Sequence, residues 1–287
     1  MRRLRFGHAL AALLLPTLLC ACGSNSTRPG FDPQIVVFGY LYVGEPVSGL
    51  GGIHLGRTMP VDEYYDVDQA AIQNAFVTLR ADGAVLADTL SRVGTGVFGN
   101  PAVIIRAKTM YHLEIRVDGK TITATTTTPA AFETPREPRA MTAGVMRHSA
   151  IADSFPIVVA CPDPGQIFLV DVWCAEDWQN ARFIHRIGGQ DTPESYDEYG
   201  GANGEPRHIT AYFRLREIPQ SSEGYRVSFY GDMMWFYGQY KVGVFSIDEN
   251  YYNYLYRDHP ERSGGINGGI GVFGSACRKQ YSVKVVE

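Results

Sequence analysis

The sequence has 287 residues, of which 45% are apolar, 20% charged and 12% aromatic, and its formal net charge is −4. The ordinary apolar fraction and the low charge exclude a largely disordered chain. This length provides one large domain or two modest domains with hydrophobic cores. Because the chain has no excess of basic residues to neutralise phosphates, we do not expect nucleic acid as a partner.

The first 21 residues have the pattern of a secretory leader. Three arginines within residues 2–5 precede an apolar run at 9–19, which is shorter than the roughly 20 residues that span a bilayer. The run ends in Leu-Cys-Ala-Cys, which resembles a bacterial lipobox and implies that the sulfur of Cys22 carries a diacylglycerol after cleavage. An ordinary signal peptide is the alternative. Because Gly23 follows, and not the aspartate that commonly retains lipoproteins at the inner membrane, the resemblance implies a lipid anchor in the outer membrane, with the protein on its periplasmic or cell-surface face.

Short apolar or alternating runs predict strands throughout residues 34–128. The run IVVFGYLYV opens this part, and the turn dipeptides Asp82-Gly83 and Asp118-Gly119 each separate two strand-like runs, which is typical of β-hairpins. Six or seven short strands in about 100 residues indicate a small β-sandwich.

The second half is predicted to be β-rich with one short helix. Apolar runs predict strands at residues 155–161, 166–174, 182–187, 208–216, 225–230, 235–247 and 280–286. The sequence PDPG between the first two predicts a hairpin turn. The acidic, glycine-rich stretch 188–206 is expected to be a solvated loop. Capping-box spacing from Ser246 to Glu249, with Pro260 beyond, predicts a helix over residues 248–258.

The predicted fold class is therefore mainly β, in five segments. They are a leader (1–21), a polar, flexible stalk (22–33), a β-sandwich domain (34–128), a proline-containing linker (129–140) and a β-rich C-terminal domain (141–287).

Three cysteines follow Cys22 in the sequence. Pairing centred on the predicted PDPG turn places Cys161 and Cys174 too far apart along the ladder for a disulfide, whose Cα atoms lie within about 7 Å of each other. We therefore expect a disulfide from one of them to Cys277 on the last strand, and we predict the pair Cys174–Cys277. The alternative is three thiols that pack as small hydrophobic side chains.

No catalytic motif is present in the sequence. It contains no G-x-S-x-G, S-x-x-K or H-E-x-x-H pattern and no Cys/His cluster with zinc spacing. Two acidic groups, at residues 62–68 and 191–198, are expected to be solvated loop charge and not cation ligands. The glycine-rich stretch 264–274 opens a strand and not a helix, so we expect a bulged turn or a close backbone approach there and no phosphate loop. We predict no enzyme, no cofactor and no metal.

Aromatic residues are concentrated in the second half of the chain, where all three tryptophans lie. The aromatic residues at 235–237 are consecutive, so a strand would direct them to both faces and at least one away from a single core. Tyrosine and tryptophan are enriched at binding surfaces. Burial of these side chains beneath the helix and the loops is the alternative. We predict an aromatic surface for a glycan, a peptide or a partner protein, made up of Trp235, Tyr237, Tyr252 and Tyr256.

Four motifs, in this order, resemble an uncharacterised family of outer-membrane lipoproteins: VVFGYL, YHLEIRVDGKTITATTTTP, SIDENYYNYL and INGGIGVFGSA. The resemblance to this domain-of-unknown-function family implies an immunoglobulin- or transthyretin-like first domain and a gene close to that of a TonB-dependent receptor. It implies no activity and no catalytic residue. We expect a lipid-anchored binding or accessory protein that assists a TonB-dependent importer, with an outer-membrane receptor as partner. The alternative is an adhesive or envelope-scaffolding β-sandwich protein.

Overall fold

The structure, a computed structural model, describes residues 31–85, 87–136, 144–147, 155–176, 182–183, 208–229, 234 and 236–287. The predicted leader, Cys22, Trp235 and the predicted acidic loop at 188–206 lie outside the described residues. Within the described residues, no helix has the length and apolar character needed to cross a bilayer.

The chain is mainly β, as predicted. The first half contains β1 (Ile35–Tyr42), β2 (Pro46–Val47), η1 (Gly49–Gly51), β3 (Ile53–Arg57), α2 (Val67–Ala70), β4 (Phe76–Ala81), β5 (Asp88–Gly94), β6 (Val97–Ile104), β7 (Met110–Val117), β8 (Lys120–Thr127) and β9 (Glu133–Arg136). The second half contains β10 (Val145–Arg147), β11 (Phe155–Ala160), β12 (Ile167–Cys174), β13 (Arg182–Phe183), β14 (His208–Arg214), η3 (Leu215–Glu217), β15 (Gln220–Ser221), β16 (Gly224–Phe229), β17 (Phe236–Ile247), α5 (Glu249–Tyr256), α6 (Pro260–Ser263), β18 (Ile266–Asn267) and β19 (Ile270–Val286).

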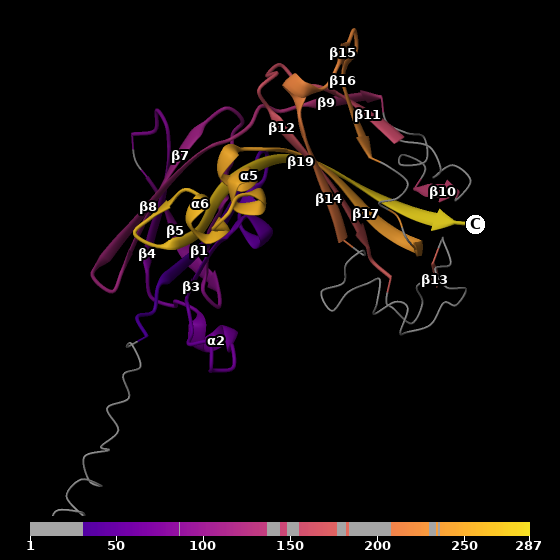
Figure 1. The fold of residues 1–287 in the computed structure, drawn as a ribbon. Coiled ribbons are helices and arrows are strands. Elements are labelled where there is room, and N and C mark those ends of the chain that lie inside the picture. Colours follow the sequence, from indigo (N-terminus) through magenta and orange to yellow (C-terminus); the bar gives the residue numbers. More distant parts are fainter. Residues whose placement is uncertain are drawn as a thin grey trace, which may run out of the picture.

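Strands β1 to β8 surround one hydrophobic core. Alternate residues point inward, such as Val77 on β4, Ile115 on β7 and Ile122 on β8, and they share a cluster with Val37 on β1 and Ile53 on β3. Because distant strands of one sheet contribute to the same cluster, the sheet folds back over itself as a β-sandwich (Figure 1). Both predicted hairpins are present, as the pairings β4–β5 and β7–β8.

Strand β19 joins the two halves of the chain. Its first residues pair in parallel with β1, from Val36–Ile270 to Tyr42–Ala276, and its later residues pair with β17 in antiparallel. Figure 1 shows β19 crossing from the sandwich to the C-terminus. One sheet of 15 strands therefore runs through both halves. The domain boundaries at residues 128 and 141 remain a prediction from the sequence.

The second half is built from two facing sheets. Phe168 and Val170 on β12 and Val242 on β17 form a core with Val159 and Tyr225 of the four-stranded sheet β15-β16-β11-β9. The other face of β12 and β17 belongs to a separate cluster, against which tyrosines of α5 pack. The main sheet thus has a core on each face here.

The predicted hairpin around PDPG is wrong. Strand β11 pairs with β16 and β9, whereas β12 pairs with β14 and β17 in the main sheet. The two strands belong to different sheets, so the segment between them is a crossover and not a hairpin turn. Pro162 and Pro164 fit this role, since proline provides no N–H for a ladder.

The predicted helix is present, with a different cap. Helix α5 covers Glu249–Tyr256, and Asp248, not Ser246, is its N-cap. Pro260 opens the next short helix, α6, at a position where its missing N–H is tolerated. Strand β19 begins at Ile270, well before the predicted start at residue 280, because the glycine-rich stretch is itself part of the β1 pairing.

Candidate binding surface on helix α5 and strand β14

Asp248 fixes the start of helix α5. Its Oδ1 accepts hydrogen bonds from the backbone N–H of Tyr251 and of Ser275, each at 3.0 Å, and its Oδ2 accepts one from Thr126 Oγ1 at 2.6 Å. Burial raises the pKa of the Asp248 carboxyl above its ordinary value, while these hydrogen bonds act in the opposite direction. One carboxylate therefore ties the helix to β8 of the sandwich and to β19.

Asn250 adds a second attachment in the first turn of the helix. Its Nδ2 donates to the carbonyl oxygens of Thr125 at 2.7 Å and of Phe273 at 2.9 Å. Helix α5 is short, and a helix of two turns depends on such tertiary contacts for its stability. The two side chains at its start hold it in a defined orientation.

The inner side of α5 packs on β1 through aromatic rings. Tyr251 lies against Tyr40 with ring centroids 4.6 Å apart, and Tyr254 meets Phe38 edge-on at 5.8 Å. Burial raises the pKa of the Tyr251 hydroxyl well above its usual range. Both tyrosines are half-buried, and Tyr251 packs against the hydrophobic cluster on this face of the sheet.

Three other rings form an outward cluster, which we call the tyrosine patch: Tyr212 on β14 with Tyr252 and Tyr256 on α5. Their centroids are 4.7 to 5.3 Å apart, and the side chain of Tyr212 is 43% exposed. The Tyr256 hydroxyl donates to Thr210 Oγ1 at 3.3 Å. The patch therefore spans the helix and the strand at one end of the sheet order.

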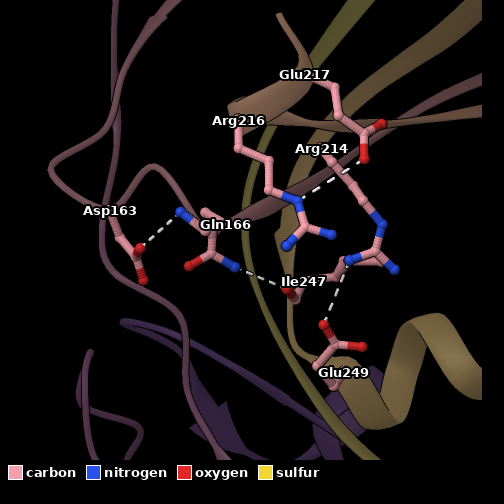
Figure 2. Close-up of polar contacts among 8 residues, drawn as sticks. Asp163, Gln166, Arg214, Arg216, Glu217, Ile247 and Glu249 are labelled. Carbon is pink, nitrogen blue, oxygen red and sulfur yellow. Dashed lines mark hydrogen bonds and ion pairs between the residues drawn. The ribbon is translucent and has the colours of Figure 1, made fainter.

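Arg214 lies beside the tyrosine patch. Its guanidinium carbon is 4.5 Å from the ring centroid of Tyr252, and its Nη1 is 3.5 Å from Glu249 Oε1, the ion pair drawn in Figure 2. Tyr212 and then Arg214 lower the pKa of the Tyr252 hydroxyl, because polar hydrogens of both neighbours favour its charged form. The patch thus combines aromatic faces with a cation.

The same face of the sheet continues away from the helix with further polar and aromatic side chains. Strand pairing places Trp173 opposite His208 on β14 and opposite Lys241 on β17, and the Lys241 ammonium lies 5.0 Å from the Trp173 ring centroid. His208 Nε2 contacts Asp171 Oδ1. Trp173 is 39% exposed, so a further aromatic ring is available on this face, beyond the three of the tyrosine patch.

Only part of the predicted aromatic surface is brought together. Tyr252 and Tyr256 are neighbours in the tyrosine patch, whereas Tyr237 packs against the core between the two sheets and Trp235 lies outside the described residues. Sequence reasoning missed Tyr212 and Trp173. Exposed and half-buried residues alternate along β14, and this alternation in the sequence could have indicated that Tyr212 is exposed. Only the tertiary structure shows that Tyr212 contacts α5.

The predicted disulfide between Cys174 and Cys277 is not formed. Cys161, Cys174 and Cys277 are thiols, and within the described chain no disulfide joins any two of them. Cys174 pairs with Tyr240 of β17, whereas Cys277 pairs with Ser246 further along the same strand. At about 3.3 Å per strand residue, this separation exceeds the reach of a disulfide.

A polar cleft of about 750 Å³ lies beside the start of α5, between β8 and the crossover before β12. Its walls are held by internal hydrogen bonds, among them Gln166 Nε2 to the Ile247 carbonyl oxygen at 2.7 Å and the Gly165 N–H to Asp163 Oδ1 at 2.8 Å (Figure 2). Asp248 also lines it and is engaged as described above. These polar groups are already paired, so the tyrosine patch is the better candidate for a binding surface.

The acidic group at residues 62–68 has a structural role in part, since Asp66 caps α2 by accepting hydrogen bonds from the N–H groups of Asp68 and Gln69. The second predicted acidic group lies outside the described residues. Among the residues that the structure describes, no group of three or more His, Cys, Asp or Glu side chains is placed to hold a metal ion.

Comparison with known proteins gives no family. No family model and no curated protein matches the chain. Among solved structures, the FN1–FN3 domains of chicken CNTN1 are 8% identical, with a TM-score of 0.24, over 88% of this chain and 66% of theirs. A titin fragment, A168169, is 10% identical with a TM-score of 0.20, over 90% of this chain and all of the fragment. The site is therefore interpreted from its own geometry.

Proposed function

We propose that this chain is a lipid-anchored accessory protein of the outer membrane that binds a partner protein through the tyrosine patch. The partner in this proposal is the outer-membrane receptor of a TonB-dependent importer. A glycan is the competing ligand, since aromatic faces also stack on sugars.

The observation that carries the proposal is the contact of three tyrosine rings, Tyr212 of β14 with Tyr252 and Tyr256 of the firmly attached helix α5. Tyr212 is exposed, the two helix tyrosines are half-buried, and Arg214 of β14 lies against the Tyr252 ring. Tyrosine, tryptophan and arginine dominate the energetics of protein interfaces. Tyrosine loses little conformational entropy on binding, and a patch that is already ordered loses less still. Trp173 and Lys241 continue the surface along the sheet, and these described residues form no enclosed pocket, which suits a protein partner better than a small molecule.

The lipid anchor is the first testable part of the proposal. Residues 31–34, just before β1, are exposed and have no regular structure, which suits a chain that leaves the body toward a membrane. We expect the mature protein to begin at Cys22 with a diacylglyceryl thioether, as mass spectrometry of the N-terminal peptide would detect. Cleavage at another residue, or an unmodified Cys22, would contradict the anchor and leave the binding surface to be tested separately.

The second testable part is the tyrosine patch. We expect a photo-crosslinking amino acid at position 212 to attach to an outer-membrane receptor in living cells. We expect the double variant Tyr212→Ser/Tyr252→Ser to lower the amount of receptor that co-purifies after gentle detergent extraction at least about tenfold, because truncating a tyrosine at an interface hot spot costs about 2 kcal/mol or more.

The matched control is Tyr64, which is 92% exposed and lies in the loop before α2. Its crosslinker and its Tyr64→Ser variant should leave receptor capture unchanged. Crosslinks from position 212 to polysaccharide alone would favour a glycan ligand. A lone monomer with no crosslink from position 212 would contradict binding through the patch and favour the scaffolding alternative.

A further inference from the structure

The segment after β11 brings Cys161 close to the start of β9. In this sheet Ala160 of β11 lies opposite Glu133 of β9. The register is irregular between Val158 and Ala160, the ladder ends at this pair, and Cys161 follows directly. Its Sγ donates to the carbonyl oxygen of Asp163 at 3.7 Å. Cys161 is partly buried and packs against the core between the two sheets.

Cys277 approaches the same point from the main sheet. Lys279 is two residues further along β19 and therefore shares a face with Cys277. Its Nζ donates to Thr134 Oγ1 at 2.7 Å and lies 3.7 Å from Glu133 Oε2, so this face of β19 is directed at β9. Cys277 also packs against the core between the sheets, and its thiol has a hydrogen bond with the backbone of Phe132.

Charge on Cys161 acts on the thiol of Cys277, as expected for two side chains that pack against the same core near β9. Burial raises the pKa of both thiols, and negative charge on Cys161 contributes to the rise at Cys277. Both groups are therefore protonated at neutral pH, where the thiolate is the reactive form. Their oxidation needs a disulfide that can exchange with them.

We propose that Cys161 and Cys277 form a disulfide that fastens the four-stranded sheet to β19. The Sγ–Sγ bond forms as the two thiols lose two protons and two electrons. A disulfide oxidant accepts both and is reduced to a pair of thiols. In the cell, the protein meets such an oxidant only if it is exported, because disulfides form and persist in oxidising compartments. This part of the inference rests on the proposed function.

The sequence predicts a disulfide to Cys277 from either of the other two thiols, with Cys174–Cys277 as the selected pair; the pair proposed here is the other one. Cys174, the third thiol, is buried on the same side of β12 as Phe168, but it lies further along the sheet, opposite Tyr240. The proposed bond connects residues far apart in the chain, so it restricts the unfolded state strongly.

The test uses the full mature protein in detergent, reduced and then treated with oxidised glutathione. We expect the intact mass to fall by two hydrogens and non-reducing peptide mapping to show a Cys161–Cys277 link. We expect the midpoint of thermal unfolding of the oxidised form to lie roughly 5–10 °C above that of the reduced form.

The matched control is Cys174→Ala, which should oxidise as the wild type does, whereas Cys161→Ser and Cys277→Ser should not form an internal bond. The wild type provides a readout independent of variant folding, since dithiothreitol should reverse its mass and thermal shifts. Mapping that finds no Cys161–Cys277 link, or a link to Cys174, would overturn the proposal. A bond that forms with glutathione but is absent from protein isolated from cells would support the geometry and count against export.

Discussion

Replacing Gly271 by alanine should prevent the two halves of the chain from joining. Gly271 has φ +115°, a conformation that other residues rarely adopt, and it lies opposite Val37 in the parallel β1–β19 ladder. A Cβ at this position would be 2.0 Å from the carbonyl oxygen of Val37. Since that neighbour is backbone, relief requires β1 and β19 to separate. We expect a loss of about 4 kcal/mol or more in the free energy of unfolding, measured by urea titration.

The control for this variant is Gly44→Ala. Gly44 also has a positive φ, of +82°, but a Cβ there would meet nothing within 4 Å. The Gly44→Ala variant therefore has the backbone strain of a positive φ without a steric overlap. We expect it to lower the free energy of unfolding by only about 1 kcal/mol. Equal losses for the two variants would show that the β1–β19 contact does not limit stability.

The role of Gly271 could be predicted only in part. The glycine-rich stretch at 264–274 indicated a close backbone approach, and the structure has one, but the sequence did not identify β1 as the neighbour. Parallel pairing between strands at opposite ends of a chain leaves no local turn signal. Local hairpins are different, because Asp118 and Gly119 specify their turn within two residues, and that hairpin was predicted correctly.

The predicted PDPG hairpin shows the limit of the same reasoning. Turn residues between two apolar runs indicate a change of direction, but they do not say whether the second run returns to the same sheet. Here β12 enters the main sheet, so the relative placement of Cys161 and Cys174 inferred from the hairpin does not hold. The tyrosine patch was half predicted for a similar reason: Tyr252 and Tyr256 are one helical turn apart, whereas Tyr212 joins them only through tertiary packing.

Replacing Asp248 by alanine should destabilise the protein by about 3 kcal/mol. The substitution removes the N-cap of α5 and leaves the N–H groups of Tyr251 and Ser275 and the hydroxyl of Thr126 without their acceptor. Each lost cap or buried hydrogen bond is worth about 1 kcal/mol. Thermal unfolding should shift down by roughly 6 °C or more. Glu249→Ala is the control, since Glu249 is exposed and its ion pair with Arg214, at 3.5 Å, contributes about 1 kcal/mol.

The pH dependence of Asp248 provides a more specific test. Burial raises the pKa of its carboxyl in the folded protein above the ordinary value of the unfolded chain. Between these two values the folded state binds more protons, so this group adds stability as the pH falls from neutral through the raised pKa, and loses that gain as the pH rises again. Asp248→Asn keeps an acceptor and a donor but cannot titrate. As the pH is lowered from 7 towards 4, the wild type should therefore gain stability relative to Asp248→Asn, measured as the difference between their free energies of unfolding. The contributions of the other carboxylates are the same in both proteins and cancel in this difference. A constant difference, or one that moves against the wild type, would mean that the hydrogen bonds from Thr126, Tyr251 and Ser275 outweigh burial and keep this carboxylate charged.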